Sequence, residues 1–180
     1  KYKLILTDYK MKGLRIIFLL LISSQIFGQI STSSPTSSFT VKGKVKKEKS
    51  ITLEDLKKYP NQILNNVNTS CSPKNEERSN NVKVVLLKSV LDSVEYDYQK
   101  SRNLNQFYFL FVAADGYKIV FSFNEIYNTE IGNNLFIVTE KDGNMVGDMN
   151  NRILLLSTKD LKGGSRNMKW LSKIIVCKAE

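Results

Sequence analysis

The stretch QFYFLFVAADGYKIVFSF, residues 106–123, decides how this chain folds. Aromatic and branched residues, which favour β-strands, flank the dipeptide Asp115-Gly116 on both sides. An Asp-Gly pair between two such runs is typical of a tight β-hairpin turn. We therefore predict two antiparallel strands joined at this turn. Five aromatic side chains are expected to form a strand face in the core: Tyr108, Phe109, Phe111, Phe121 and Phe123.

Short strands and short helices are predicted on either side of this hairpin. Ser122 with Glu125, and Thr52 with Asp55, have the spacing of a capping box, which starts a helix. A second apolar stripe at helical spacing predicts a helix within residues 84–94, with these side chains inward: Leu87, Val90, Leu91 and Val94. Strands are expected at residues 39–45, 61–71, 134–146 (with a turn at Asp142-Gly143), 152–157 and 171–178.

The order of these elements predicts the fold class. Strands and helices are mixed and do not alternate as βαβα units, which indicates an α+β fold. We expect a single mixed-sheet domain over residues 39–180. Trp170 and Leu171 should pack the loop of residues 158–170 against the last strands.

The N-terminal region has the pattern of an export signal. Residues 11–29 read MKGLRIIFLLLISSQIFGQ, with basic residues, then an apolar core, then small and polar residues. The apolar run is too short to span a bilayer, which takes about 18 residues or more. We interpret residues 1–28 as a signal peptide with an upstream extension, and residues 29–38 as a Ser/Thr-rich linker. The mature protein is expected to be secreted or periplasmic and not membrane-spanning.

Charge and composition narrow the chemistry. The chain has 27 basic and 17 acidic residues, for a net charge of +10. Removing residues 1–28 takes away five basic residues and one acidic residue, which leaves 22 − 16 = +6. The remaining charges are interspersed without a basic stripe, so we expect no nucleic-acid partner. The absence of His removes the commonest general base, and no catalytic residue is assigned, since Asp115 has no evident partner.

Several stretches of the sequence, and the order in which they follow one another, resemble the molybdopterin-binding domain of the sulfite oxidase family of oxidoreductases. The resemblance covers most of residues 39–180. Its most specific part is GGSRNMKWLSKIIV at residues 163–176. The other matching pieces are FTVKGKV, ITLEDLKKYP, VVLLKSVLD, FVAADGYKIVFSFNEI and RILLL.

The resemblance implies roles for four residues. Cys71, at the end of a predicted strand, stands where the family has the cysteine thiolate that ligates molybdenum, and a soft thiolate suits such a metal. The family's Gly-Ser-Arg-x-x-Lys loop helps to hold the phosphate of the pterin. Ser165, Arg166 and Lys169 match that loop and are the implied cofactor contacts.

Other features of the sequence differ from the family's pattern. They decide between a non-catalytic binding domain and an active oxidoreductase. Ser72-Pro73-Lys74 follows Cys71 in place of small residues, and no twin-arginine pair precedes the apolar core of the signal. An export route that carries unfolded chains would leave no chance to load a pterin beforehand. We therefore expect an exported, non-catalytic domain that binds a protein partner or a small anion and holds no cofactor. The alternative is an active molybdopterin-dependent oxidoreductase with Cys71 as the molybdenum ligand.

Cys71 has three readings from the sequence. It could be the metal ligand implied by the resemblance, a free thiol, or half of a disulfide with Cys177, since exported chains with two cysteines often pair them. The ligand and disulfide roles exclude each other, because a disulfide sulfur cannot also serve as an anionic thiolate ligand.

Overall fold

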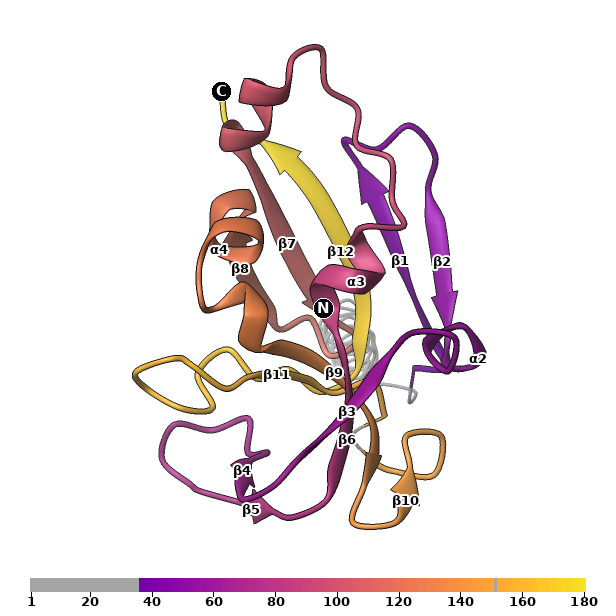
Figure 1. Ribbon diagram of the computed structural model, residues 1–180, viewed down its shortest axis with the longest axis vertical. Coiled ribbons are helices and arrows are strands. Elements are labelled where there is room, and N and C mark those ends of the chain that lie inside the picture. The colour runs from indigo at the N-terminus through magenta and orange to yellow at the C-terminus, as the bar shows by residue number, and fades with distance from the viewer. Residues whose placement is uncertain (1–35, 151) are drawn as a thin grey trace, which may run out of the picture. The chain divides into compact units, whose positions relative to one another are not determined.

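The computed structural model describes residues 36–150 and 152–180 of the chain (Figure 1). The predicted signal peptide (1–28) and most of the predicted linker lie outside these residues. The central hairpin is confirmed: β7 (Phe107–Ala113) pairs antiparallel with β8 (Lys118–Ser122). The turn is closed by a hydrogen bond from the Gly116 N–H to the Ala113 carbonyl, and Asp115 accepts from the Tyr117 N–H.

The aromatic face of this hairpin is smaller than predicted. Phe109, Phe111 and Phe121 are fully buried. Tyr108 is only half-buried, because successive side chains of a strand point to opposite faces and its neighbours take the core face. Phe123 is the first residue of a helix and is partly buried against the same core.

The hairpin is one side of a five-stranded sheet with the order β2-β1-β12-β7-β8. Its other strands are β1 (Ser38–Gly43), β2 (Lys49–Thr52) and β12 (Leu171–Lys178), which lie side by side in Figure 1. β1 and β12 run parallel, and all other neighbours run antiparallel. The sheet is therefore mixed, as predicted.

A second sheet has the order β10-β9-β6-β3, with β11 also paired to β9. Its pairs are all antiparallel. Its strands are β3 (Asn61–Leu64), β6 (Val82–Leu86), β9 (Leu135–Lys141), β10 (Asn144–Met145) and β11 (Leu155–Ser157). A separate two-stranded ribbon pairs β4 (Val67–Asn68) with β5 (Arg78–Ser79).

Short helices join these strands. α2 (Leu53–Leu56) and α4 (Phe123–Asn128) each begin at a predicted capping box, with Thr52 and Ser122 as the N-caps. α3 (Leu87–Leu91) buries the predicted side chains, and Val94 beyond it is also buried. Two short 3-10 helices, η2 (Ser101–Gln106) and η3 (Gly132–Asn134), complete the set in the part of the chain described here.

Two predicted boundaries were wrong for a physical reason. Residues 82–86 form β6 and not the start of a helix, because Val82, Val84 and Val85 are β-branched and pair with strands on both sides. The strand expected over residues 61–71 stops at Leu64. Asn66 has a positive φ of 51°, which breaks the strand well before Cys71.

The buried side chains form two apolar clusters. The larger contains the core face of the first sheet together with α3 and α4, including Phe109, Leu91 and Ile126. The smaller lies on the second sheet and contains Val82, Val84, Phe136, Val138, Leu154 and Leu156, with Cys71 packed against it. Cys71 is thus held by packing at the second sheet. Among the described residues, no helix combines the length and the apolar character needed to cross a bilayer.

Candidate functional site

Three loops that are far apart in the sequence meet around Cys71. They are residues 68–72 after β4, the turn of residues 115–117, and residues 163–170 before β12. Asn167 ties two of them together: its side-chain amide donates to the Asn68 and Ser70 carbonyls at 3.3 and 2.7 Å. Its oxygen accepts from the Ser157 N–H at 2.9 Å. Asn167 is almost fully buried, so each of these bonds forms away from solvent.

Gly164 brings the last loop against the cysteine loop. Its φ is +82°, and a Cβ at this position would lie 2.8 Å from the Ser72 carbonyl oxygen and 3.0 Å from that of Ser70. Only glycine allows this approach without strain. The glycine of the Gly-Ser-Arg run therefore allows a close contact with the backbone of residues 70 and 72, which belongs to the protein itself.

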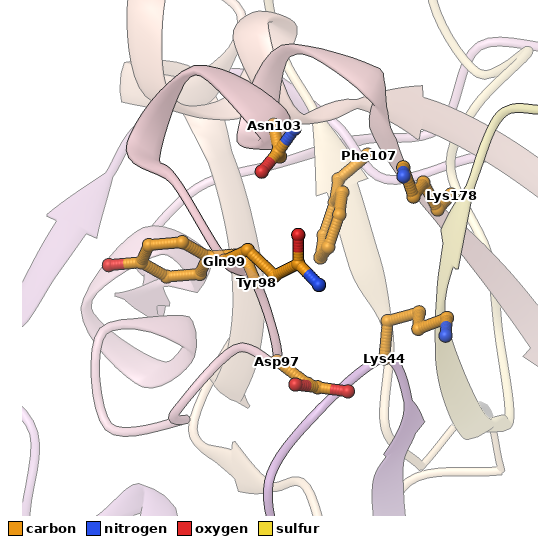
Figure 2. A pocket seen from close by; sticks show the side chains of 7 residues that line it. All are labelled: Lys44, Asp97, Tyr98, Gln99, Asn103, Phe107 and Lys178. Carbon is orange, nitrogen blue, oxygen red and sulfur yellow. The ribbon is translucent and has the colours of Figure 1, made fainter.

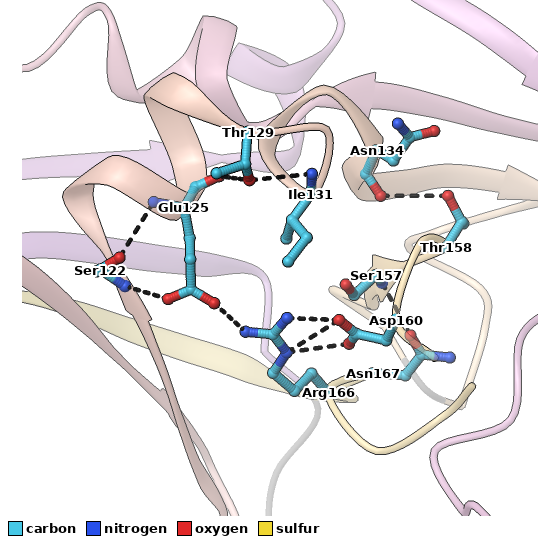
Figure 3. Close-up of polar contacts among 10 residues, drawn as sticks. All are labelled: Ser122, Glu125, Thr129, Ile131, Asn134, Ser157, Thr158, Asp160, Arg166 and Asn167. Atoms are coloured by element: carbon cyan, nitrogen blue, oxygen red, sulfur yellow. Dashed lines mark hydrogen bonds and ion pairs between the residues drawn. The ribbon is translucent and has the colours of Figure 1, made fainter. Parts of the chain in front are cut away.

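Arg166 lies inside a network of carboxylates (Figure 3). Its Nε donates to both carboxylate oxygens of Asp160, at 3.2 and 3.0 Å, and its Nη2 also donates to Asp160. Its Nη1 donates to Glu125 at 2.8 Å. The guanidinium carbon lies 4.1 Å from the centre of the Phe121 ring. Two carboxylates and an aromatic ring thus surround this cation.

Glu125 caps the start of α4 and also forms an ion pair with Arg166. Burial alone would raise its pKa, but hydrogen bonds from Ser122 and Arg166 outweigh burial and lower the pKa from 4.5. The pKa of Arg166 is raised, chiefly by its hydrogen bond to Asp160. The predicted helix cap at Glu125 is confirmed, and its second role as a partner of Arg166 joins α4 to the last loop.

Cys71 is half-buried, and its thiol is not activated. Burial raises the pKa of the thiol, which favours the protonated form. The nearby ammonium and backbone N–H of Lys169 act in the opposite direction, and the carboxylates of Glu77 and Asp115 raise the pKa further. The structure thus brings Cys71 and Lys169 together, as the resemblance implies, but keeps the sulfur a neutral thiol in this environment.

In the loop of residues 163–170, Lys169 is the cation without a carboxylate partner among the described residues. Its ammonium lies 4.1 Å from the centre of the Trp170 ring, and within the described ranges it forms no ion pair. The Tyr117 hydroxyl donates to the Ser165 carbonyl at 2.9 Å and fixes the loop beside it. Trp170, predicted to be in the core, is only half-buried, because its indole N–H donates to the Asn150 carbonyl. Leu171 is fully buried, as predicted.

The two cysteines are free in this structure. The disulfide considered above is therefore wrong for this fold. Cys71 packs against the second sheet, whereas Cys177 lies near the end of β12 and pairs with Tyr108 in the first sheet. Figure 1 shows the end of β12 and the β4–β5 ribbon on opposite sides of the strands between them. Disulfide formation needs α-carbons within about 7 Å, and these two cysteines are packed in different sheets.

A groove of about 500 Å³ adjoins the site. Gly163 and Gly164 line one side of it, and the asparagines that follow β3 line the other. The hydroxyl oxygen of Ser157, which also lines the groove, is buried and has no hydrogen-bond partner in the described structure. The groove is thus polar and open to a ligand of moderate size.

Asp160 and Asn167 have central roles that the sequence did not point to. Asp160 lies in a loop six residues before Arg166, and this spacing has no periodicity that would signal a contact. Asn167 contacts carbonyls almost a hundred residues away along the chain. Both interactions depend on loop packing, which leaves no pattern in a single sequence.

The residues of the site match a molybdopterin only in part, because Cys71 and Lys169 lie together whereas Arg166 is compensated. The phosphate of a pterin needs free cations, but two carboxylates compensate Arg166. Lys169, which has no carboxylate partner in the described ranges, is the cation of this loop that a phosphate could contact.

Comparison with known proteins gives a likeness in fold. No protein-family model and no curated protein matches the chain. Among solved structures, the sulfane dehydrogenase SoxCD from Paracoccus pantotrophus is similar, with a TM-score of 0.50 and 14% sequence identity. The match covers 77% of this chain and 37% of that one, so this chain spans little more than a third of that protein's length. This likeness shows the fold alone and supports the resemblance to the sulfite oxidase family at that level.

Proposed function

We propose that this chain is an exported, non-catalytic domain with a sulfite-oxidase-like fold, which binds a small anion or an anionic group of a partner at Lys169. The proposal rests on a difference between the two cations of the loop of residues 163–170: one has carboxylate partners and the other has none in the described ranges. Arg166 is neutralised by Asp160 and Glu125, whereas Lys169 is free of any carboxylate in the described ranges. Arg166 holds the loop in place, and Lys169 presents the charge.

The surroundings of Lys169 support an anion contact. The Ser165 carbonyl is fixed by Tyr117, which leaves the Ser165 hydroxyl as a donor close to the same loop. The groove reaches the same loop at Gly163 and Gly164, the two residues before Ser165. Ser165 and Lys169 therefore keep the binding role implied by the resemblance, while Arg166 becomes a structural residue.

Thermal unfolding at low salt tests this function. Phosphate, pyrophosphate and sulfite are titrated against the mature protein and against K169A. A ligand that binds only the folded state stabilises it by about 2.7 kcal/mol at a hundredfold excess over Kd. We expect a concentration-dependent rise of Tm in the wild type that is lost in K169A. Lys162→Ala is the control, since this exposed lysine lies just before the loop of residues 163–170 and should leave the rise unchanged.

Metal and pterin analysis of protein purified from its native compartment separates the two functions. The proposal expects neither molybdenum nor a pterin in stoichiometric amount. Stoichiometric molybdenum that disappears in C71S would establish the oxidoreductase instead.

A further inference from the structure

A second pocket lies at the end of β12, whereas the loop of residues 163–170 precedes the start of that strand. Figure 2 shows the residues that line the pocket. It has a volume of about 210 Å³. Drug-sized ligands occupy clefts of about 300–1,000 Å³, so this pocket suits a smaller molecule. It is lined by Lys44, Asp97, Tyr98, Gln99, Asn103, Phe107 and Lys178.

Backbone hydrogen bonds hold the walls of this pocket in place. The Lys44 N–H donates to the Val176 carbonyl at 2.8 Å, at the carboxyl ends of the parallel strands β1 and β12. The Asp97 N–H donates to the Lys44 carbonyl at 3.1 Å. The Asn103 oxygen accepts from the Lys100 N–H at 2.9 Å, which leaves the Asn103 NH₂ group as a donor. The pocket is therefore built before any ligand arrives.

Three charged side chains line the pocket without pairing with one another. Lys44, Lys178 and Asp97 form no ion pair in the structure described for residues 36–180. Figure 2 shows Lys178 beside Phe107 and Lys44 below them, with Asp97 at the lower edge of the opening and Gln99 in its middle. Opposite charges around one small space, with none in contact, leave room for a ligand between them. The Phe107 ring, which is buried, gives the pocket an apolar wall.

We propose that this pocket binds a small zwitterion of the amino-acid class. A simple anion would be attracted by the two ammonium groups and repelled by Asp97, and a simple cation would meet the reverse. A ligand with a carboxylate and an ammonium satisfies all three charges at once. With two positive groups and one negative group in the pocket, an acidic amino acid such as L-glutamate matches the charge count. The amides of Gln99 and Asn103 supply further hydrogen bonds.

Calorimetric titration with matched compounds tests this inference. L-glutamate, glutarate and 1,5-diaminopentane are titrated into the wild-type protein at one pH and low salt. Glutarate keeps both carboxylates of glutamate and lacks the amine, and the diamine has no carboxylate. We expect L-glutamate to bind at least tenfold more tightly than either compound. Glutarate binding as tightly as L-glutamate would overturn the zwitterion, and no binding of any compound at 10 mM would overturn the site.

Two variants place the binding in this pocket. D97N should weaken L-glutamate at least tenfold and leave glutarate unchanged or tighter, because it removes only the partner of the amine. K44Q/K178Q should weaken both compounds. Lys173→Gln, an exposed lysine of the same strand as Lys178, is the control and should change neither. L-glutamate affinity that is unchanged in D97N would contradict the proposal. Unfolding curves of each variant confirm that the fold is kept.

Discussion

At Arg166, charge compensation sets the role of the side chain. The Arg166 and Glu125 side chains are 23% and 33% exposed, and Asp160 is 10% exposed, so the network is partly shielded from water. Removing the cation would leave Asp160 without its charged donor and Glu125 with only its hydrogen bonds at the start of α4. A partly buried charged group that loses its hydrogen bonds costs more than the pair contributes.

We predict that R166Q lowers the free energy of unfolding by about 1–3 kcal/mol at neutral pH. The pH dependence follows from Glu125. Its pKa is lowered in the folded state, so its contribution is complete above the ordinary value of 4.5 and is lost as the pH falls through the lower folded value. The difference between wild type and R166Q should therefore be constant near neutrality and shrink below pH 4.5.

Urea unfolding at several pH values measures this difference. Arg78→Gln is the matched control, because Arg78 pairs with Glu76 at an exposed position and surface pairs contribute about 0–1 kcal/mol. If both substitutions lowered the free energy of unfolding equally, the Arg166 network would contribute no more to stability than an exposed ion pair.

Cys71 provides a second test at the scale of one residue. Because burial raises the pKa of its thiol, little thiolate is present at neutral pH. We predict that iodoacetamide labels Cys71 in the native protein more slowly than a free cysteine at pH 7. Site-resolved mass spectrometry measures the rate. Thiol counting after denaturation without reductant should find two thiols, and a count of zero would restore the disulfide.

At the scale of elements, the contact between the parallel strands β1 and β12 depends on Gly43. Its φ is +97°, and a Cβ there would lie 2.3 Å from the Val176 carbonyl oxygen. This carbonyl also accepts the Lys44 N–H that forms part of the second pocket. The end of β1 can approach β12 only because this position has no side chain.

G43A should therefore be among the most destabilising single substitutions in the chain. Backbone strain costs about 1–3 kcal/mol, and forcing extra atoms into a packed contact costs about 1–3 kcal/mol more. G116A is the control: its φ is +88°, but nothing lies within 4 Å of the added Cβ, so it carries the strain alone. Thermal unfolding of both proteins separates the two costs. Equal losses of stability would show that the β1–β12 contact relaxes freely.

At the scale of the whole molecule, the N-terminal sequence pattern predicts where the protein works. The apolar core after Lys12 and Arg15 predicts export and removal of residues 1–28. Export as an unfolded chain agrees with the proposed function, which needs no cofactor loaded before translocation. We propose that the site forms from the chain alone, once the chain folds outside the cytoplasm.

We predict that the mature protein begins near Gln29 and is recovered from the periplasm or the medium. N-terminal sequencing of the protein from fractionated cells measures both. An intact residue 11–28 segment in the mature protein would contradict export by this route. A cytoplasmic marker protein, followed in the same fractions, controls for lysis.

Local patterns were sufficient for most of the elements. The Asp115-Gly116 hairpin, the caps at Thr52 and Ser122 and the buried stripe of α3 each depend on neighbours a few residues apart. Turn preference, capping geometry and apolar periodicity act over that range, so the sequence alone determined these elements and the α+β class. The break at Asn66 escaped prediction because a positive φ in a non-glycine residue leaves no pattern.

The chemistry of the site was decided only by the tertiary structure. Ser165, Arg166 and Lys169 look alike in the sequence as parts of one polar loop. Loop packing places Asp160, and α4 places Glu125, so that both carboxylates pair with Arg166. Neither forms an ion pair with Lys169. The same packing buries Cys71 against the second sheet, far from Cys177. The electrostatic role of a charged or titratable group depends on which charges and how much water surround it, and only the fold sets those surroundings.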